Sequence, residues 1–416
     1  MSIWRDYVFQ WKTFPRNIRI FFWFDLTYQL SVTVYALYFP RYLLALGHRE
    51  DTLGSLMAAG TLCMALCSTA MGLLSDRIGR RRSLIYGVTI SKSAFLARGF
   101  LVSIPAMYGT YVIDGVFITL YSAACTPFIF ENVQDDQRVH AFSMYGILLR
   151  AAGIAGNVVG GFLPIAVRLF RPGIDELGLY RAIFALAAAL AAYGISRLFF
   201  LAEAPVATRA LPGGERPPAS GVSRQDLSFI LKFVLTSALV AFGAGNFLPF
   251  MNTYLIQTFH APPATVGLFL SFAQVAVILG MAFAPRLAER RGLIRSIMLT
   301  RFLALPMFIL MAVSRNLWMA AVTFALRNML QQMSGPVTNT FVLSQLDRRT
   351  RATANGLLHT AENGARALAM FTSGRVITQR GYPAVFLIAF LTYSVSALLF
   401  YVFFARPRAR PEVHPH

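Results

Sequence analysis

The stretch GLLSDRIGRRRSL, Gly72–Leu84, places four arginines and an aspartate between two long apolar runs of the chain. Gly72 and Gly79 stand on either side of the aspartate, Asp76. A glycine costs little where the backbone must turn or where two helices come close. The stretch therefore predicts a short, charged connection between two apolar helices.

The composition places these helices in a lipid bilayer. Of 416 residues, 56% are hydrophobic and 13% are charged, which is too little charge to cover the surface of a soluble protein. Apolar runs of about 20 residues, enough to cross about 30 Å of hydrocarbon as a helix, recur along the chain. None shows the alternation of barrel strands. We predict an all-α membrane protein with twelve transmembrane helices, at 18–45, 53–75, 83–104, 106–131, 141–167, 178–201, 227–257, 263–287, 294–313, 316–344, 352–378 and 382–405.

The net charge of +20 is explained by where the basic residues lie. They gather in alternate connections, at 77–82, 209–224, 286–295, 348–351 and 406–410. Because basic loops stay in the cytoplasm, we predict an integral protein of the cell membrane with both termini cytoplasmic. The segment before the first helix is too charged and too long for a signal peptide. We expect membrane lipid as a partner and no nucleic acid.

The second half of the chain repeats the first. YLLALGH at 42–48 returns as YLIQTFH at 254–260, DRIG at 76–79 as ERRG at 289–292, and GILLRAA at 146–152 as GLLHTAE at 356–362. The order and nearly constant spacing predict two six-helix bundles related by a pseudo-two-fold axis along the membrane normal. We place them at 1–202 and 227–416, joined by a cytoplasmic linker at 203–226 that is rich in Pro, Gly and Arg.

The pattern of Gly72, Asp76, Arg77, Gly79 and Arg80, between the second and third predicted helices, resembles the signature loop of the major facilitator superfamily. The resemblance extends over the twelve-helix, two-repeat organisation of essentially the whole chain. It implies a secondary transporter whose two bundles rock about a central site and expose it to one side of the membrane at a time. Within the family, the chain resembles the proton-coupled exporters of drugs and metabolites.

The charges of this loop suit a gate. Asp76 can accept hydrogen bonds at a neighbouring helix N-terminus, and the family places that partner at the eleventh helix. The arginines can bind anionic headgroups, or pair with acids on the other bundle, for which we nominate Glu131. The predicted gating residues are Gly72, Asp76, Arg77, Gly79, Arg80 and Glu131. The alternative is that Arg80, Arg81 and Arg82 only anchor the loop in the cytoplasm.

Eight charged residues fall inside the predicted helices: Asp25, Lys92, Arg98, Asp114, Arg150, Arg327, Glu362 and Arg366. At roughly 3 kcal/mol each on insertion scales, they would cost on the order of 24 kcal/mol if all faced lipid. Most must therefore face one another or water. We expect Arg98 to extend outward to the interface, and the sequence offers no account of Lys92.

Several of these residues are candidates for binding substrate or protons. His359, Glu362 and Arg366 share one helix face, either as a proton-sensitive cluster or as a buried pair that fixes packing. Arg150 and Arg327 come from opposite halves and could clamp a carboxylate or phosphate, or neutralise Asp25 or Asp114. The full candidate set is Asp25, Asp114, Arg150, Asn246, Asn252, Arg327, His359, Glu362 and Arg366.

Two helices carry marked glycine and proline patterns. GIAGNVVGGFLP at 153–164 permits close helix contact. It resembles the glycine-rich element of family members that export drugs in exchange for protons, with Asn157 where proline is usual. In the seventh helix, Pro249 should bend the backbone, and Asn246 and Asn252 could offer polar contacts to a ligand.

The sequence favours a transporter that moves a small organic solute by alternating access, as a proton-coupled antiporter working in efflux. The alternatives are proton-coupled uptake of an organic anion and, from another class, a membrane receptor that does not transport. Motifs for ATP binding, metal-dependent hydrolysis and serine hydrolysis do not occur. We therefore predict no enzyme, no cofactor and no metal site. We also expect a monomer. Cys63, Cys67 and Cys125 are expected to pack as small apolar residues.

Overall fold

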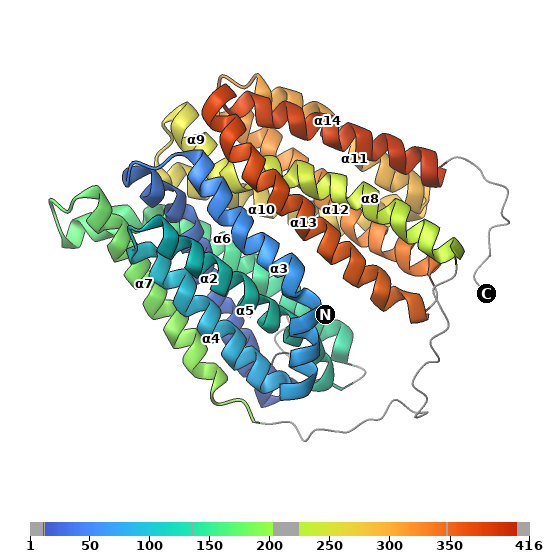
Figure 1. The fold of residues 1–416 in the computed structure, drawn as a ribbon, viewed down its shortest axis with the longest axis horizontal. Coiled ribbons are helices and arrows are strands. Elements are labelled where there is room, and N and C mark those ends of the chain that lie inside the picture. Colours follow the sequence, from blue (N-terminus) through green and yellow to red (C-terminus); the bar gives the residue numbers. More distant parts are fainter. Residues whose placement is uncertain (1–10, 12, 135–136, 203–223, 347, 406–416) are drawn as a thin grey trace, which may run out of the picture. The chain divides into compact units, whose positions relative to one another are not determined.

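The computed structural model describes residues 11, 13–134, 137–202, 224–346 and 348–405. The regular structure of these residues is helical, and none of them lies in a strand. The long helices are α2 (Arg16–Ala45), α3 (Glu50–Ile78), α4 (Arg80–Ala97), α5 (Ile104–Glu131), α6 (Arg138–Phe170), α7 (Glu176–Leu198), α8 (Arg224–Phe247), α10 (Pro263–Arg291), α11 (Leu293–Ala312), α12 (Leu317–Gln345), α13 (Arg348–Arg380) and α14 (Tyr382–Phe400) (Figure 1). Short elements are η1 (Arg98–Phe100), η3 (Leu248–Phe250), α9 (Met251–Phe259) and η4 (Tyr401–Ala405).

All twelve predicted spans are confirmed as helices, with ends that differ by a few residues. The seventh span is interrupted as predicted at Pro249, where the single turn η3 separates α8 from α9. Proline has no N–H to donate and cannot continue the α-helical hydrogen bonding. The third span is shorter than predicted, because α4 ends at Ala97 and η1 follows.

The contacts divide the chain into two compact units. The first contains Met1–Gly221 together with Met251–Phe272, and the second contains Val222–Phe250 together with Ala273–His416. The sequence places the division between the bundles in the linker 203–226, of which 203–223 lie outside the described residues. The segment 251–272, which follows the break at η3, packs with the first unit.

Both units pair their helices in the same way. In the first, α2 packs against α6 and α7, and α5 packs against α4. In the second, α8 packs against α13 and α14, and α12 packs against α11. Each pair in one unit corresponds to a pair six spans further along the chain, so the structure repeats as the sequence does.

The backbone repeats as well. Residues with φ in the left-handed region occur at Gly47 and His260, at Gly79 and Gly292, and at Gly173 and Gly381. The first two pairs are 213 residues apart and the third 208, close to the spacing of the sequence matches. Each residue turns the chain after a corresponding helix. His260 is the non-glycine member, at φ 50°, a conformation that a side chain makes costly.

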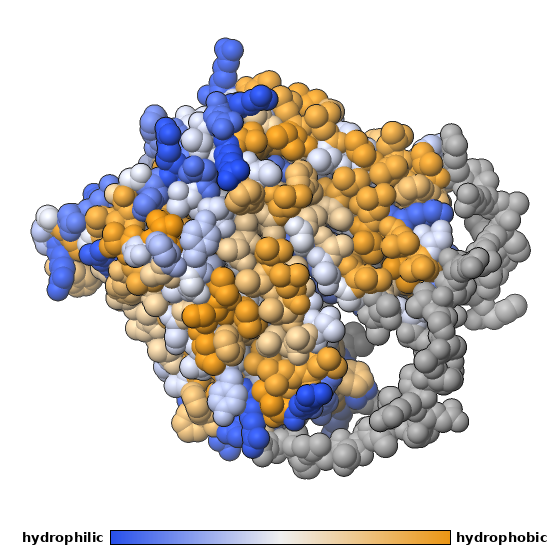
Figure 2. Space-filling model, viewed as in Figure 1, coloured by the Kyte–Doolittle hydropathy of each residue, from blue (hydrophilic) through white to orange (hydrophobic). Residues whose placement is uncertain are grey.

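The apolar surface of the helices is the surface expected of a protein in a lipid bilayer. Among the described residues, nine helices are long and apolar enough to cross a membrane. The other three long helices, α4, α12 and α13, carry more charged and polar side chains. Large apolar side chains are exposed on nearly every helix, for example Leu66, Leu169 and Leu391, and Figure 2 shows broad apolar areas on the face in view. Areas of this kind mark a surface covered by lipid.

Candidate functional site

The loop after α3 is built around a sharp turn at Gly79. Its φ of 87° lies in the left-handed region, so a side chain at this position would strain the backbone. The turn makes Gly79 the end of α3 and the start of α4. At Gly72, by contrast, an added Cβ would have no atom within 4 Å. The structure therefore supports the predicted need for glycine at Gly79 and not at Gly72.

Arg80 holds this loop together. Its Nη1 lies 2.6 Å from the carboxylate of Asp76 and donates to the Ser75 hydroxyl at 3.2 Å, while its Nε donates to Glu131 at 3.3 Å. The predicted pair with Glu131 is present, but our placement of that acid on the other bundle is wrong: Glu131 ends α5, in the same unit as Arg80. This ion pair therefore braces one unit. Asp76 and Arg77 are exposed, and helix capping by Asp76 stays a prediction.

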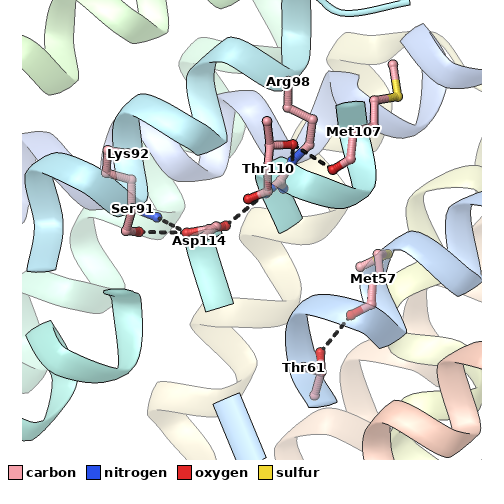
Figure 3. A network of polar contacts seen from close by, with 8 residues as sticks. All are labelled: Met57, Thr61, Ser91, Lys92, Arg98, Met107, Thr110 and Asp114. Carbon is pink, nitrogen blue, oxygen red and sulfur yellow. Dashed lines mark hydrogen bonds and ion pairs between the residues drawn. The ribbon is translucent and has the colours of Figure 1, made fainter. Parts of the chain in front are cut away.

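Inside the first unit, Asp114 on α5 joins two cations (Figure 3). Its Oδ1 lies 3.6 Å from Lys92 Nζ on α4 and accepts from the Ser91 hydroxyl at 2.6 Å. Its Oδ2 accepts from Arg98 Nη2 at 3.1 Å. Arg98 also donates to the backbone and hydroxyl oxygens of Thr110. The outward extension predicted for Arg98 is wrong, because the residue is 2% exposed and its guanidinium is paired with Asp114 inside the unit.

Aromatic rings cover these cations. The Lys92 ammonium lies 5.0 Å from the ring centre of Tyr28 and 4.5 Å from that of Phe95. The Arg98 guanidinium lies 3.4 Å from the ring centre of Tyr111. Such contacts stabilise a cation that has left water. Arg150 and Arg327 are thus not needed to neutralise Asp114, since Lys92 and Arg98 do so.

Asp25 has a different environment. It lies on α2, 2% exposed, and its Oδ1 accepts a hydrogen bond of 2.6 Å from the Tyr121 hydroxyl on α5. Its Oδ2 has no hydrogen-bond partner, and no cation among the described residues forms an ion pair with it. Tyr121 packs against Tyr28, which in turn covers Lys92. Asp25 is therefore linked to the Asp114 cluster through the rings of Tyr121 and Tyr28.

The glycines of α6 make close contacts, as predicted. A Cβ on Gly156 would clash with Thr33 on α2, and one on Gly161 would come within 3.0 Å of the Pro263 carbonyl oxygen at the start of α10. Further along the same two helices, the Ser271 hydroxyl of α10 donates to the Ile154 carbonyl of α6 at 3.1 Å. The glycine-rich element thus lets α6 approach α2 on one side and the segment 251–272 on the other.

The two asparagines of the seventh span bind protein atoms. Asn246 on α8 accepts from the Ser373 hydroxyl of α13 at 2.7 Å. Asn252 on α9 donates to the Leu37 carbonyl of α2 at 2.6 Å, while its Oδ1 is buried without a partner. Their predicted contacts with a ligand stay predictions, and each has a defined structural role.

Arg327 lies in the core of the second unit, 2% exposed. It donates to the Tyr393 hydroxyl and to Asn328, and the rings of Phe247, Phe308 and Tyr393 surround it. Arg301, which is not among the residues predicted from the sequence, is also buried and has two N–H groups without partners. Arg301 lies one helical turn before the core residue Ala304, and this spacing could have predicted that its side chain faces the core.

On α13, Glu362 and Arg366 are half-buried and His359 is exposed. The described residues contain no ion pair between Glu362 and Arg366, so the alternative of a permanently paired couple is not seen in this structure. A Cβ added at Gly245 on α8 would lie 2.9 Å from the Arg366 carbonyl oxygen, so the two helices are close at this point. Arg150, on α6, is half-buried. Among the described residues, no group of three His, Cys, Asp or Glu could hold a metal ion.

Two helix bundles of repeated topology, with charges buried inside them, are the organisation of the two-repeat membrane transporters. The family model described as Major Facilitator Superfamily matches residues 26–237 and again 233–416. The chain belongs to this superfamily. Its members are transporters and not enzymes. No curated protein matches the chain.

Solved structures of low sequence identity share the fold. The nucleoside transporter NupG is 15% identical, with a TM-score of 0.74 over 94% of this chain and 99% of its own. A D-xylose-proton symporter is 16% identical, with a TM-score of 0.72 over 95% and 98%. The human organic anion transporter MFSD10 is 17% identical, with a TM-score of 0.61 over 93% and 100%. The range of solutes in these names shows that the fold alone does not select one.

Proposed function

We propose that this protein is a secondary active transporter that moves a small organic solute by alternating access, coupled to protons and working in efflux. The observation that carries the coupling is Asp25, a carboxyl group inside the first unit that has a phenol donor and no cation. In such a place an ionised carboxylate has lost its water without gaining a counter-charge. A bound proton removes that cost.

A carboxyl group of this kind can couple proton movement to a change in conformation. Its proton is held while the group is buried and is released when water reaches the group, so proton affinity follows access to water. Asp114 is less suited, because its carboxylate is already paired with Lys92 and Arg98. Glu362 is the second candidate, since it is half-buried with Arg366 one helical turn away.

The direction of transport is supported by the glycine-rich element of α6. It resembles that of family members that exchange drugs for protons, and its glycines make the close contacts that such an element requires. Uptake of an organic anion is the alternative. It would use Arg150 and Arg366, whereas Arg327 already binds Tyr393. Further parts of the proposal are a monomer in the cytoplasmic membrane with both termini in the cytoplasm, and a gate at Asp76, Arg77 and Arg80.

The first experiment separates a transporter from a receptor. A screen for raised melting temperature across metabolites and drugs identifies ligands, because binding stabilises the folded state in proportion to occupancy. Purified protein in sealed vesicles is then tested for exchange of the labelled ligand across the membrane. Exchange above that of protein-free vesicles supports transport. Saturable binding without exchange in either direction would contradict it and leave the receptor.

A further inference from the structure

A pocket of about 440 Å³ lies where the start of α2 meets the end of α7, within the first unit. Three arginines line it: Arg16, Arg19 and Arg197. No acidic residue is among its lining side chains. Three positive charges around one hollow repel each other, so the pocket is suited to an anion.

Two of these arginines have free donors. The side chains of Arg16 and Arg19 are exposed, and their guanidinium groups make no hydrogen bond or ion pair with the described residues. Arg197 donates to the Tyr193 hydroxyl at 2.9 Å and stacks near the same ring. A phosphate group could accept from all three guanidinium groups, which are the side chains best suited to bind it.

The remaining walls are apolar and aromatic: Trp11, Ile20, Trp23 and Tyr193. Trp23 is 55% exposed and Tyr193 52% exposed, although both lie on helices that cross the membrane. Tryptophan and tyrosine gather where the headgroups of a bilayer meet its hydrocarbon. A soluble anion would leave these rings uncovered, whereas the glycerol and upper acyl chains of a lipid would cover them.

The walls are held in place by contacts next to the pocket. Asn17, between Arg16 and Arg19, donates to Asn132 at 3.0 Å and to the Ala202 carbonyl at 3.1 Å, and accepts from the Ala202 N–H at 3.1 Å. These bonds fix the start of α2 against the end of α5 and the residues that follow α7. The arginines therefore extend from a fixed frame.

We propose that this pocket binds the phosphate of an anionic phospholipid, with Arg16, Arg19 and Arg197 around the phosphate and Trp23 and Tyr193 against the upper part of the acyl chains. The site is separate from the charges proposed to couple transport. Each pocket arginine that contacts the lipid phosphate should raise the affinity for an anionic lipid about fivefold. Loss of two arginines should therefore weaken binding about 30-fold.

The test compares Arg16→Gln/Arg19→Gln with the control Arg168→Gln/Arg171→Gln, which removes the same charge from exposed arginines at the end of α6. Each protein is placed in nanodiscs of phosphatidylcholine with increasing phosphatidylglycerol, and the phosphatidylglycerol that stays bound after extraction is counted by native mass spectrometry. Equal melting temperatures in pure phosphatidylcholine confirm that both variants fold.

We expect half-saturation of the bound phosphatidylglycerol to shift about 30-fold in the pocket variant and little in the control. Equal retention by wild type and the pocket variant, or an equal loss in the control, would overturn the proposal. Inorganic phosphate or glycerophosphate added at millimolar concentration should not displace the lipid. Displacement would assign the pocket to a soluble anion and would also overturn it.

Discussion

Replacing Asp114 by Asn should destabilise the first unit strongly. The change keeps the size of the side chain but removes the one negative charge that Lys92 and Arg98 share, at 3.6 and 3.1 Å. Both cations are almost fully buried. Each would then face aromatic rings and neutral oxygens without a counter-charge.

The size of the effect follows from this count of charges. Removing one partner of a buried ion pair costs about 3–5 kcal/mol, because the other charge remains buried and unpaired. Lys92→Met is the matched control: it leaves Asp114 paired with Arg98 and should cost less than about 1.5 kcal/mol. For a unit of this size, 1 kcal/mol corresponds to about 2–4 °C in melting temperature. Asp114→Asn should therefore lower the melting temperature by about 6–20 °C.

Melting of the purified variants in one detergent measures these shifts, and the double variant sharpens the comparison. Lys92→Met/Asp114→Asn leaves a single buried cation instead of two, so it should melt at a higher temperature than Asp114→Asn alone. An Asp114→Asn protein that melts within 2 °C of wild type would contradict the shared ion pair. So would a double variant that melts below Asp114→Asn.

Three further changes probe other parts of the structure. Asp76→Asn should slow exchange in vesicles strongly while folded protein stays in the membrane, because losing a charge at a helix terminus shifts a conformational equilibrium by about 0.3–2 kcal/mol; exchange at the wild-type rate would rule this out. Tyr121→Phe should cost about 1–3 kcal/mol in a melting experiment, because Asp25 then has two buried oxygens without a donor; an unchanged melting temperature would show that the bond does not matter. Gly115→Val should prevent folded expression, since its Cβ would clash with the Gly60 carbonyl, and a monodisperse protein in detergent would contradict it.

The fold could be predicted from the sequence because its determinants are local. Long apolar runs define the spans, Gly79 defines a turn, and Pro249 defines the break between α8 and α9. Each needs only the chemistry of a short segment.

The partners of the buried charges could not be predicted in the same way. Asp114 binds two cations from α4 and η1, and helix rotation decides which of several charges at similar depth meet. Arg98 illustrates this, because its place near the end of a helix suggested the interface and its rotation brings it to Asp114. Tyr121 was missed although it lies two turns from Asp114 on α5, at a spacing that puts both on one face.

Grouping of the segment 251–272 with the first unit also lay beyond the sequence. The repeat assigns it to the second half, yet Asn252 bonds the Leu37 carbonyl and Gln257 bonds Glu50 at 2.6 Å. The one sequence signal was Pro249, which breaks the span at η3 and so allows its two ends to have different neighbours.

Accumulation driven by a pH gradient tests the proposed coupling most directly. Sealed vesicles containing wild type, Asp25→Asn or Glu362→Gln are loaded with the ligand found by the stability screen, and uptake of labelled ligand is followed with and without an imposed gradient. Exchange without a gradient, together with an unchanged melting temperature, serves as the control for folding and binding in each variant.

Wild type should concentrate the ligand only when the gradient is imposed, and Asp25→Asn should exchange it at equilibrium without concentrating it. Loss in Glu362→Gln alone would move the proton site to α13 and contradict the role given to Asp25. Equal accumulation by wild type with and without the pH gradient would contradict proton coupling altogether.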